Sequence, residues 1–128
     1  MSENRLADYV GHMQQAATDA CGFVDGLAKD AFLEDKRTQQ AVVMSLIIIG
    51  EAAAKAMDSY AEFAQTHPEV PWRSMRGMRN RIAHGYFEIN LDLVWDTVQT
   101  ALPELLKQLH AVRKDVEDEE HGDDRMKP

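Results

Sequence analysis

The feature that most restricts the fold is the segment of residues 38–57, where alanines and branched aliphatic residues occupy most sides of a helical period. A helix that is apolar on most sides must be buried, so we expect this segment to form the central helix of the molecule. Its longest apolar stretch, residues 41–49, is interrupted by Ser45 and is far shorter than the roughly 20 residues needed to cross a bilayer. We therefore interpret it as a core helix and expect no membrane partner.

Gly50 lies inside this predicted helix, and Glu51 follows it. Glycine costs roughly 1 kcal/mol relative to alanine in a helix interior unless it serves packing. The sequence therefore predicts a close helix crossing at Gly50. An acid in such apolar surroundings needs a partner. We favour a structural hydrogen bond or salt bridge for Glu51 over a catalytic role, and a contact with nearby arginines stays open.

Two further long segments carry apolar residues at steps of three and four, the period of an amphipathic helix. The first is residues 6–27. The second is residues 91–112, which begins behind Asn90 as an N-cap and contains Pro103, either as a kink or as the start of a separate last helix.

The remaining elements are expected at residues 30–36 (a charged connection), 59–65 (a short helix), 68–72 (an irregular link anchored by Trp72) and 73–84 (a helix followed by Gly85). No segment shows the apolar and polar alternation of a strand. The sequence predicts an all-α, up-and-down helix bundle of four to five helices.

A chain of 128 residues is long enough for one hydrophobic core and too short for two. We expect one helical domain, residues 1–112, followed by an acidic tail, residues 113–128. Residues 115–124 hold seven acids, no lysine or arginine and one aliphatic residue, which is typical of a frayed or disordered end.

Two features of the sequence indicate the cellular compartment of the protein. The N-terminus carries Glu3 ahead of Arg5 and lacks the apolar region of a secretory signal peptide. Cys21 is the only cysteine, so it cannot form an internal disulfide and fits a small core residue in a reducing environment. These features predict a cytoplasmic protein.

The formal net charge of −8 argues at first against a nucleic-acid partner. However, four arginines lie within nine residues without an acid between them: Arg73, Arg76, Arg79 and Arg81. Because many of the acids concentrate in the tail, a local cationic patch on an acidic body is compatible with phosphate binding.

Residues 75–86 add an amide, an imidazole and a phenol to these arginines. Guanidinium groups bind phosphate oxygens and can stabilise the extra negative charge of a pentacoordinate transition state. Imidazole can take a proton from a ribose 2'-hydroxyl or return one to the leaving 5'-oxygen. These residue types suit phosphodiester cleavage, but the alternative is a solvated arginine face with a histidine that only caps the helix.

Helical spacing determines which of these side chains can meet. Asn80 and His84 are four apart and lie on one face, where the amide could orient the imidazole, and Arg76 begins the same stripe. Arg79 and His84 point about 140° apart on an ideal helix. They converge only if the helix ends or distorts nearby, if the arginine curls round, or if a second chain supplies one of them. On spacing alone, Arg81 is the better partner of His84.

The other histidines are scattered, and no cysteine or histidine pair has the spacing of zinc ligands. We expect no metal and no cofactor.

With these residues in place, the chain resembles the HepT family of toxins within the HEPN superfamily over most of residues 3–110. Members are identified by an arginine, a following polar residue and a histidine a few positions later, often with a tyrosine two positions after it. Here the motif reads Arg79-Asn80-Arg81-Ile82-Ala83-His84-Gly85-Tyr86. Three flanking elements agree as well: Ile49-Gly50-Glu51-Ala52-Ala53, the link from Pro68 to Trp72, and a leucine-rich last helix.

The resemblance implies a HEPN fold and a metal-independent endoribonuclease that cleaves transfer RNA or messenger RNA through the ribose 2'-hydroxyl. It assigns catalysis to Arg79 and His84, support to Asn80 and Arg76, and a secondary phosphate contact to Arg81. HEPN enzymes typically dimerise with their motifs facing one another. In such a homodimer, two His84 side chains could act as base and acid in a shared cleft.

HepT toxins are usually encoded with a minimal nucleotidyltransferase antitoxin of the MntA type, which can attach AMP to the motif tyrosine. The resemblance therefore implies a toxin of a type VII-like toxin–antitoxin system, in which Tyr86 becomes O-AMP-tyrosine and the homodimer could assemble further with the antitoxin. Two rival interpretations stay open. One is a non-catalytic HEPN module that binds a nucleotide or a partner, and the other is a helical regulator whose arginines contact an acidic partner.

Overall fold

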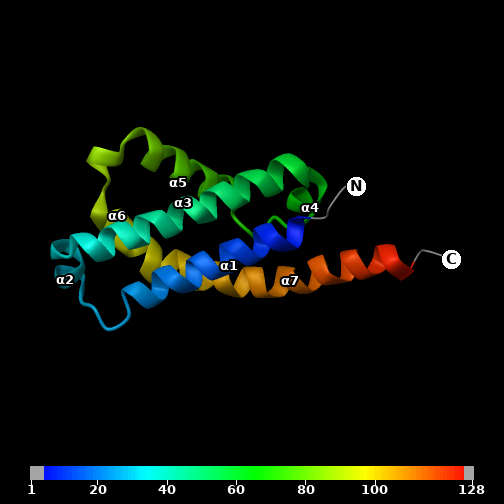
Figure 1. Cartoon of the computed structure of the whole chain (residues 1–128), viewed down its shortest axis with the longest axis horizontal. Helices are drawn as coiled ribbons and strands as arrows, with labels where there is room; N and C mark the ends of the chain where they lie inside the picture. Colours follow the sequence, from blue (N-terminus) through cyan, green and yellow to red (C-terminus); the bar gives the residue numbers. More distant parts are fainter. Residues whose placement is uncertain (1–4, 126–128) are drawn as a thin grey trace.

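Four long helices run alternately up and down in the computed structural model, which describes residues 5–125 and the side chains as far as Glu117. They are α1 (Leu6–Phe23), α3 (Lys36–Ser59), α5 (Trp72–His84) and α7 (Leu102–Arg125). α3 packs against α1 and α5, and α7 packs against the other side of α1 (Figure 1). Within the described residues there is no strand, so the predicted all-α, up-and-down bundle is confirmed.

α3 occupies the central place that its composition predicts. By length and composition it could cross a membrane, but 56% of its most apolar window is buried inside the bundle. Leu46, Ile49 and Ala53 are fully buried, and Asp35 caps the helix by accepting a hydrogen bond of 3.1 Å from the backbone N–H of Thr38. We therefore interpret α3 as the core helix.

Short elements join the long ones: α2 (Lys29–Glu34), α4 (Ala61–Thr66), the 3₁₀ turn η1 (Tyr86–Glu88) and α6 (Leu91–Asp96). The charged connection expected at residues 30–36 is wrong in part, because most of it forms α2. Phe32 is fully buried there, with its ring centroid 5.3 Å from that of Trp95 on α6. Burial of this one aromatic residue orders a segment whose other side chains are mostly charged.

Pro103 is the second residue of α7, so the last helix opens at this proline, which was one of the two expected alternatives, although no loop separates it from the preceding turns. A π-helical turn, η2 (Thr97–Ala101), joins α6 directly to α7. A proline ring clashes with the carbonyl four residues earlier in a regular α-helix, and a wider turn just before it relieves that clash. Half-buried Cys21 lies against this turn, with its sulfur 3.9 Å from the carbonyl oxygen of Val98, and burial raises the pKa of its thiol.

The boundary expected at residue 112 is not where the helix ends. α7 continues to Arg125, and Val116 is completely buried, one turn beyond Val112. The helix therefore runs on into the segment expected as a tail, and up to Val116 a four-residue apolar step explains why. Residues 126–128 of that expected tail lie outside the described part of the chain.

His67 ties α7 to the segment between α4 and α5. Its ring stacks on Phe63 with centroids 4.0 Å apart, its Nδ1 lies 2.8 Å from the Phe63 carbonyl oxygen, and its Nε2 lies 2.9 Å from Asp115 Oδ2. If Nδ1 donates to the carbonyl oxygen, Nε2 of a neutral ring carries no proton, so two acceptors face each other at Asp115. The protonated ring can donate to both partners. Burial by itself would lower the pKa of His67. The hydrogen bonds to Phe63 and Asp115 and the charge of Glu69 outweigh this effect, so the pKa is raised overall.

This contact predicts a pH-dependent contribution to stability. Because the pKa is raised in the folded state, cationic His67 contributes stability that is fully present below the unfolded value of about 6.5 and is lost as pH rises through the folded pKa. We expect His67→Gln to lower the melting temperature at about pH 6 and to lower it much less at about pH 9. Asp115→Asn should show the same trend, and a loss that is equal at both pH values would contradict it.

Candidate functional site

The residues of the predicted motif lie on α5, which turns one face to the core and the other to solvent. Trp72, Met75 and Ile82 are buried. Arg73, Asn80, Arg81 and His84 are exposed, and Arg76 and Arg79 are half-buried. No acid occurs between Trp72 and His84, so the outward face of α5 is cationic throughout.

α5 rests directly on α3 at Gly50, which confirms the predicted close crossing. A Cβ atom built on Gly50 would lie 2.4 Å from the Cβ of Arg79 and 2.6 Å from the carbonyl oxygen of Met75. Real Cβ atoms do not approach other atoms so closely, so the backbones meet here only because residue 50 has no side chain. The crossing sets the place of Arg79 relative to α3.

Arg79 is held by two neighbours. Its Nη1 lies 2.7 Å from Glu51 Oε2, and its Nε and Nη2 donate hydrogen bonds of 3.0 Å and 2.8 Å to Asn80 Oδ1. The side chain is 24% exposed, so this ion pair is partly shielded from solvent. The salt bridge expected for Glu51 is thus present, and its partner belongs to the arginine patch, but the Glu51 side chain is 51% exposed and is not buried in the apolar part of α3.

His84 is the last residue of α5, and its exposed imidazole has no hydrogen-bond partner within the described part of the chain. The expectation that Asn80 orients His84 is not met here, because the Asn80 oxygen accepts from Arg79 instead. α5 is helical through His84, with Gly85 following it as predicted. On a regular helix Arg79 and His84 lie about 140° apart, and the Arg79 guanidinium contacts Glu51 and Asn80, with no hydrogen bond to His84 in the described part of the chain.

The arginines face different surroundings. Arg81 lines a groove of about 240 Å³ beside η1 and α6, together with Ile82 and Leu93. Arg73 and Arg76 line a separate pocket of about 460 Å³ beside α4. The single patch suggested by the sequence is therefore a cationic stripe along α5 with a hollow near each end.

Tyr86 follows the helix in η1, with its side chain 48% exposed. Its ring meets Phe87 edge-on, with centroids 5.8 Å apart, and Phe87 is 99% exposed. Phe87 was not among the residues predicted for the site. In the sequence it is marked only as a large aromatic residue that directly follows the motif and belongs to no apolar helical stripe.

Metal ligation finds no support in the described side chains, where no group of three or more histidine, cysteine, aspartate or glutamate residues is placed to hold an ion. The functional groups presented by α5 and η1 are guanidinium, amide, imidazole and phenol groups.

Comparison with known proteins bears on the same segment. The family model described as "Ribonuclease HepT-like" matches residues 13–112, which include all of α3, α5 and η1. The chain belongs to the ribonuclease HepT-like family. The resemblance inferred from the motif is thereby confirmed, and the bundle is consistent with a HEPN fold.

Several relatives of this HepT-like chain are similar over most of their length. "Probable ribonuclease HepT" of Thermococcus cleftensis is 36% identical over 107 residues, which are 84% of this chain and 94% of that protein. Two proteins carry names beginning "Putative RNase". One from Methanocaldococcus jannaschii is 37% identical over 81% of this chain and 84% of its own length. The other, from Caldanaerobacter subterraneus subsp. tengcongensis, is 35% identical over 81% of this chain and 90% of its own length. No solved structure matches the chain.

Proposed function

We propose that this HepT-like protein is an endoribonuclease whose active site is assembled from the α5 helices of two chains. The observation that carries the proposal is that one helix without acids, α5, holds both a fixed guanidinium, Arg79, and an exposed imidazole, His84, which has no hydrogen-bond partner in the described part of the chain. The family membership and the names of the relatives support ribonuclease activity.

The proposed reaction uses these side chains in turn. One His84 accepts the proton of a ribose 2'-hydroxyl, and the 2'-oxygen attacks the adjacent phosphorus. Arg79 stabilises the extra negative charge of the pentacoordinate phosphorus. The bond to the 5'-oxygen breaks, and a second, protonated His84 donates a proton to it. The products are a 2',3'-cyclic phosphate and a free 5'-hydroxyl.

Two features support a second copy. The first is that Arg79 and His84 of one chain point apart, so one chain does not bring them together. The second is an outward stripe on α3, where Met44 and Ile48 are 56% and 41% exposed and lead directly to Glu51, the partner of Arg79. Apolar side chains in such a place favour burial against another chain.

Light scattering at micromolar concentration should give a molar mass of about twice the 14.5 kDa of one chain, and a monomeric mass would contradict the proposal.

Cleavage of a single-stranded RNA by the purified protein tests the reaction itself. We expect cleavage without added metal and in the presence of EDTA, with 2',3'-cyclic phosphate ends identified by mass spectrometry. Intact RNA at micromolar protein, or products with a 5'-phosphate, would contradict the mechanism.

We further propose that the protein acts as a cytoplasmic toxin and that a minimal nucleotidyltransferase inactivates it at Tyr86. The exposed phenol oxygen would attack the α-phosphorus of ATP, releasing pyrophosphate and losing its proton. The adenylate would place bulk and negative charge two residues from His84 and so oppose binding of an RNA phosphate. Incubation with the cognate transferase and ATP should add adenylate mass to the peptide containing Tyr86 but not to Tyr86→Phe. A peptide of unchanged mass would refute this role.

A further inference from the structure

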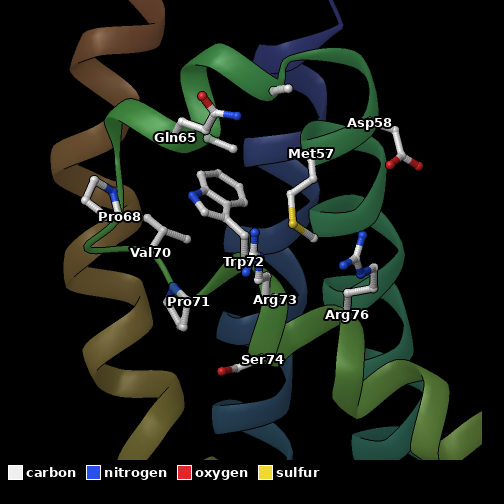
Figure 2. A pocket seen from close by; sticks show the side chains of 12 residues that line it. Met57, Asp58, Gln65, Pro68, Val70, Pro71, Trp72, Arg73, Ser74 and Arg76 are labelled. Carbon is white, nitrogen blue, oxygen red and sulfur yellow. The ribbon is translucent and has the colours of Figure 1, made fainter.

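We propose that the pocket between α4 and α5, hereafter the α4–α5 pocket, binds a nucleotide of the RNA strand away from the cleaved bond. This inference rests on the proposed ribonuclease function and adds a substrate subsite to it. The pocket has a volume of about 460 Å³, within the range of roughly 300 to 1,000 Å³ that is usual for ligand sites. Figure 2 shows it between the end of α3, α4 and the beginning of α5.

The pocket combines an apolar floor with a cationic rim. Met57, Ala64 and Trp72 line the floor, and the Trp72 ring lies under α4, fixed by a hydrogen bond of 3.0 Å from its Nε1 to the carbonyl oxygen of His67 (Figure 2). Arg73 and Arg76 supply the rim. Proteins that bind single-stranded nucleic acid combine cations for the backbone with apolar contacts for the bases. Because Trp72 is only 5% exposed, the floor offers a base apolar contact and not an open ring face for stacking.

Both rim arginines are free for a ligand. Among the described side chains neither Arg73 nor Arg76 has an ion-pair or hydrogen-bond partner, whereas Arg79 on the same helix has both. Asp58 is the one acid that lines the pocket, and it makes no ion pair with either arginine in the described structure. The lining thus carries two cations against one anion.

The pocket is in line with the proposed site of cleavage. Residues Arg73, Arg76, Asn80 and His84 fall within about 80° of one another around α5, so they form one stripe. From Arg73 to His84 the stripe is about 16 Å long, at about 1.5 Å per residue. A strand whose cleaved phosphate lies at His84 can follow this acid-free stripe and place a neighbouring nucleotide in the α4–α5 pocket. An RNA strand is favoured over an acidic peptide because the cations continue without interruption to the proposed cleavage site.

Binding should be measured in a His84→Ala background, which prevents cleavage, with a fluorescein-labelled single-stranded RNA of about twelve nucleotides. Arg73→Gln should raise Kd about fivefold to tenfold and lower the slope of log Kd against log salt by about 0.7, the value for one phosphate contact on a single strand. Asp58→Asn should lower Kd, because it removes the one anion of the lining. Lys107→Gln, an exposed cation on α7, is the matched control and should leave Kd unchanged.

Cleavage kinetics give a second readout. Arg73→Gln should raise KM for a long RNA without changing kcat, and a dinucleotide substrate should not distinguish it from the wild type. Unchanged Kd and KM in Arg73→Gln would overturn the pocket while leaving the proposed function intact, provided that the wild type cleaves RNA. If Lys107→Gln raised Kd as much as Arg73→Gln does, the pocket would also be overturned, because RNA would then be attracted by the positive charge of the protein in general. Failure of the wild type to cleave RNA would refute the proposed function, and the binding series would still decide the pocket.

Discussion

Replacing His84 by alanine is expected to lower the rate of RNA cleavage by about a hundredfold to ten-thousandfold, the usual contribution of a positioned acid or base. The effect should fall on kcat, because the imidazole moves protons only while the bond is being broken. Folding should be unaffected, because the side chain is exposed and has no hydrogen-bond partner in the described chain. Cleavage rates and thermal unfolding curves of the same preparations would check both statements.

His110 provides the matched control, since it is also an exposed histidine on a helix but lies on α7. His110→Ala should cleave RNA at the wild-type rate. If His84→Ala retained wild-type activity, the imidazole would have no part in the reaction. The non-catalytic interpretation of a nucleotide-binding or partner-binding module would then be preferred.

Gly50→Ala is expected to destabilise the protein although alanine is the better helix former. The helix propensity gains about 1 kcal/mol, but the new methyl group would meet the Met75 carbonyl oxygen at 2.6 Å, which no side-chain rotation can relieve. Overpacking of this kind typically costs about 1 to 3 kcal/mol, and here the whole of α5 must move to accommodate it. Because the clash is with backbone, the cost should lie in the upper part of this range and leave a net loss of about 1 to 2 kcal/mol, so we expect the melting temperature to fall by about 3 to 10 °C.

Gly50→Ala should also lower the rate of RNA cleavage by more than the loss of folded protein alone would explain. Displacing α5 moves Arg79 away from Glu51, so the guanidinium loses the ion pair of 2.7 Å that fixes it. Gly22→Ala is the matched control, because a Cβ atom at Gly22 in α1 would have nothing within 4 Å. Gly22→Ala should be neutral or slightly stabilising. A Gly50→Ala protein as stable as the wild type would contradict the close crossing.

The long helices could be predicted from sequence because the apolar residues at their buried faces recur every three or four positions. The prediction for residue 50 also held, because a glycine within an apolar helix has few explanations besides close packing. α2 was missed because its order depends on the burial of Phe32 against Trp95, a contact between residues far apart in the chain. The end of the last helix was placed too early because acidic composition concealed the buried step from Val112 to Val116.

The candidate site was predictable in its residue types but not in their pairing. The motif identified the cations, the amide and the imidazole of α5, yet helical spacing paired Asn80 with His84, whereas Asn80 and Glu51 both bind Arg79. Glu51 and Arg79 are 28 positions apart, and only the crossing at Gly50 brings them together. The α4–α5 pocket likewise depends on the path of the link between Pro68 and Trp72, which no periodic pattern describes.

A dimer of one wild-type chain and one His84→Ala chain, purified through a different affinity tag on each chain, tests most directly whether the two chains share one site. If one His84 acts as base and the other as acid, this mixed dimer lacks one of them, and its cleavage rate should be below about one tenth of the wild-type rate. A rate of about one half would mean that each chain works alone and would contradict the shared site.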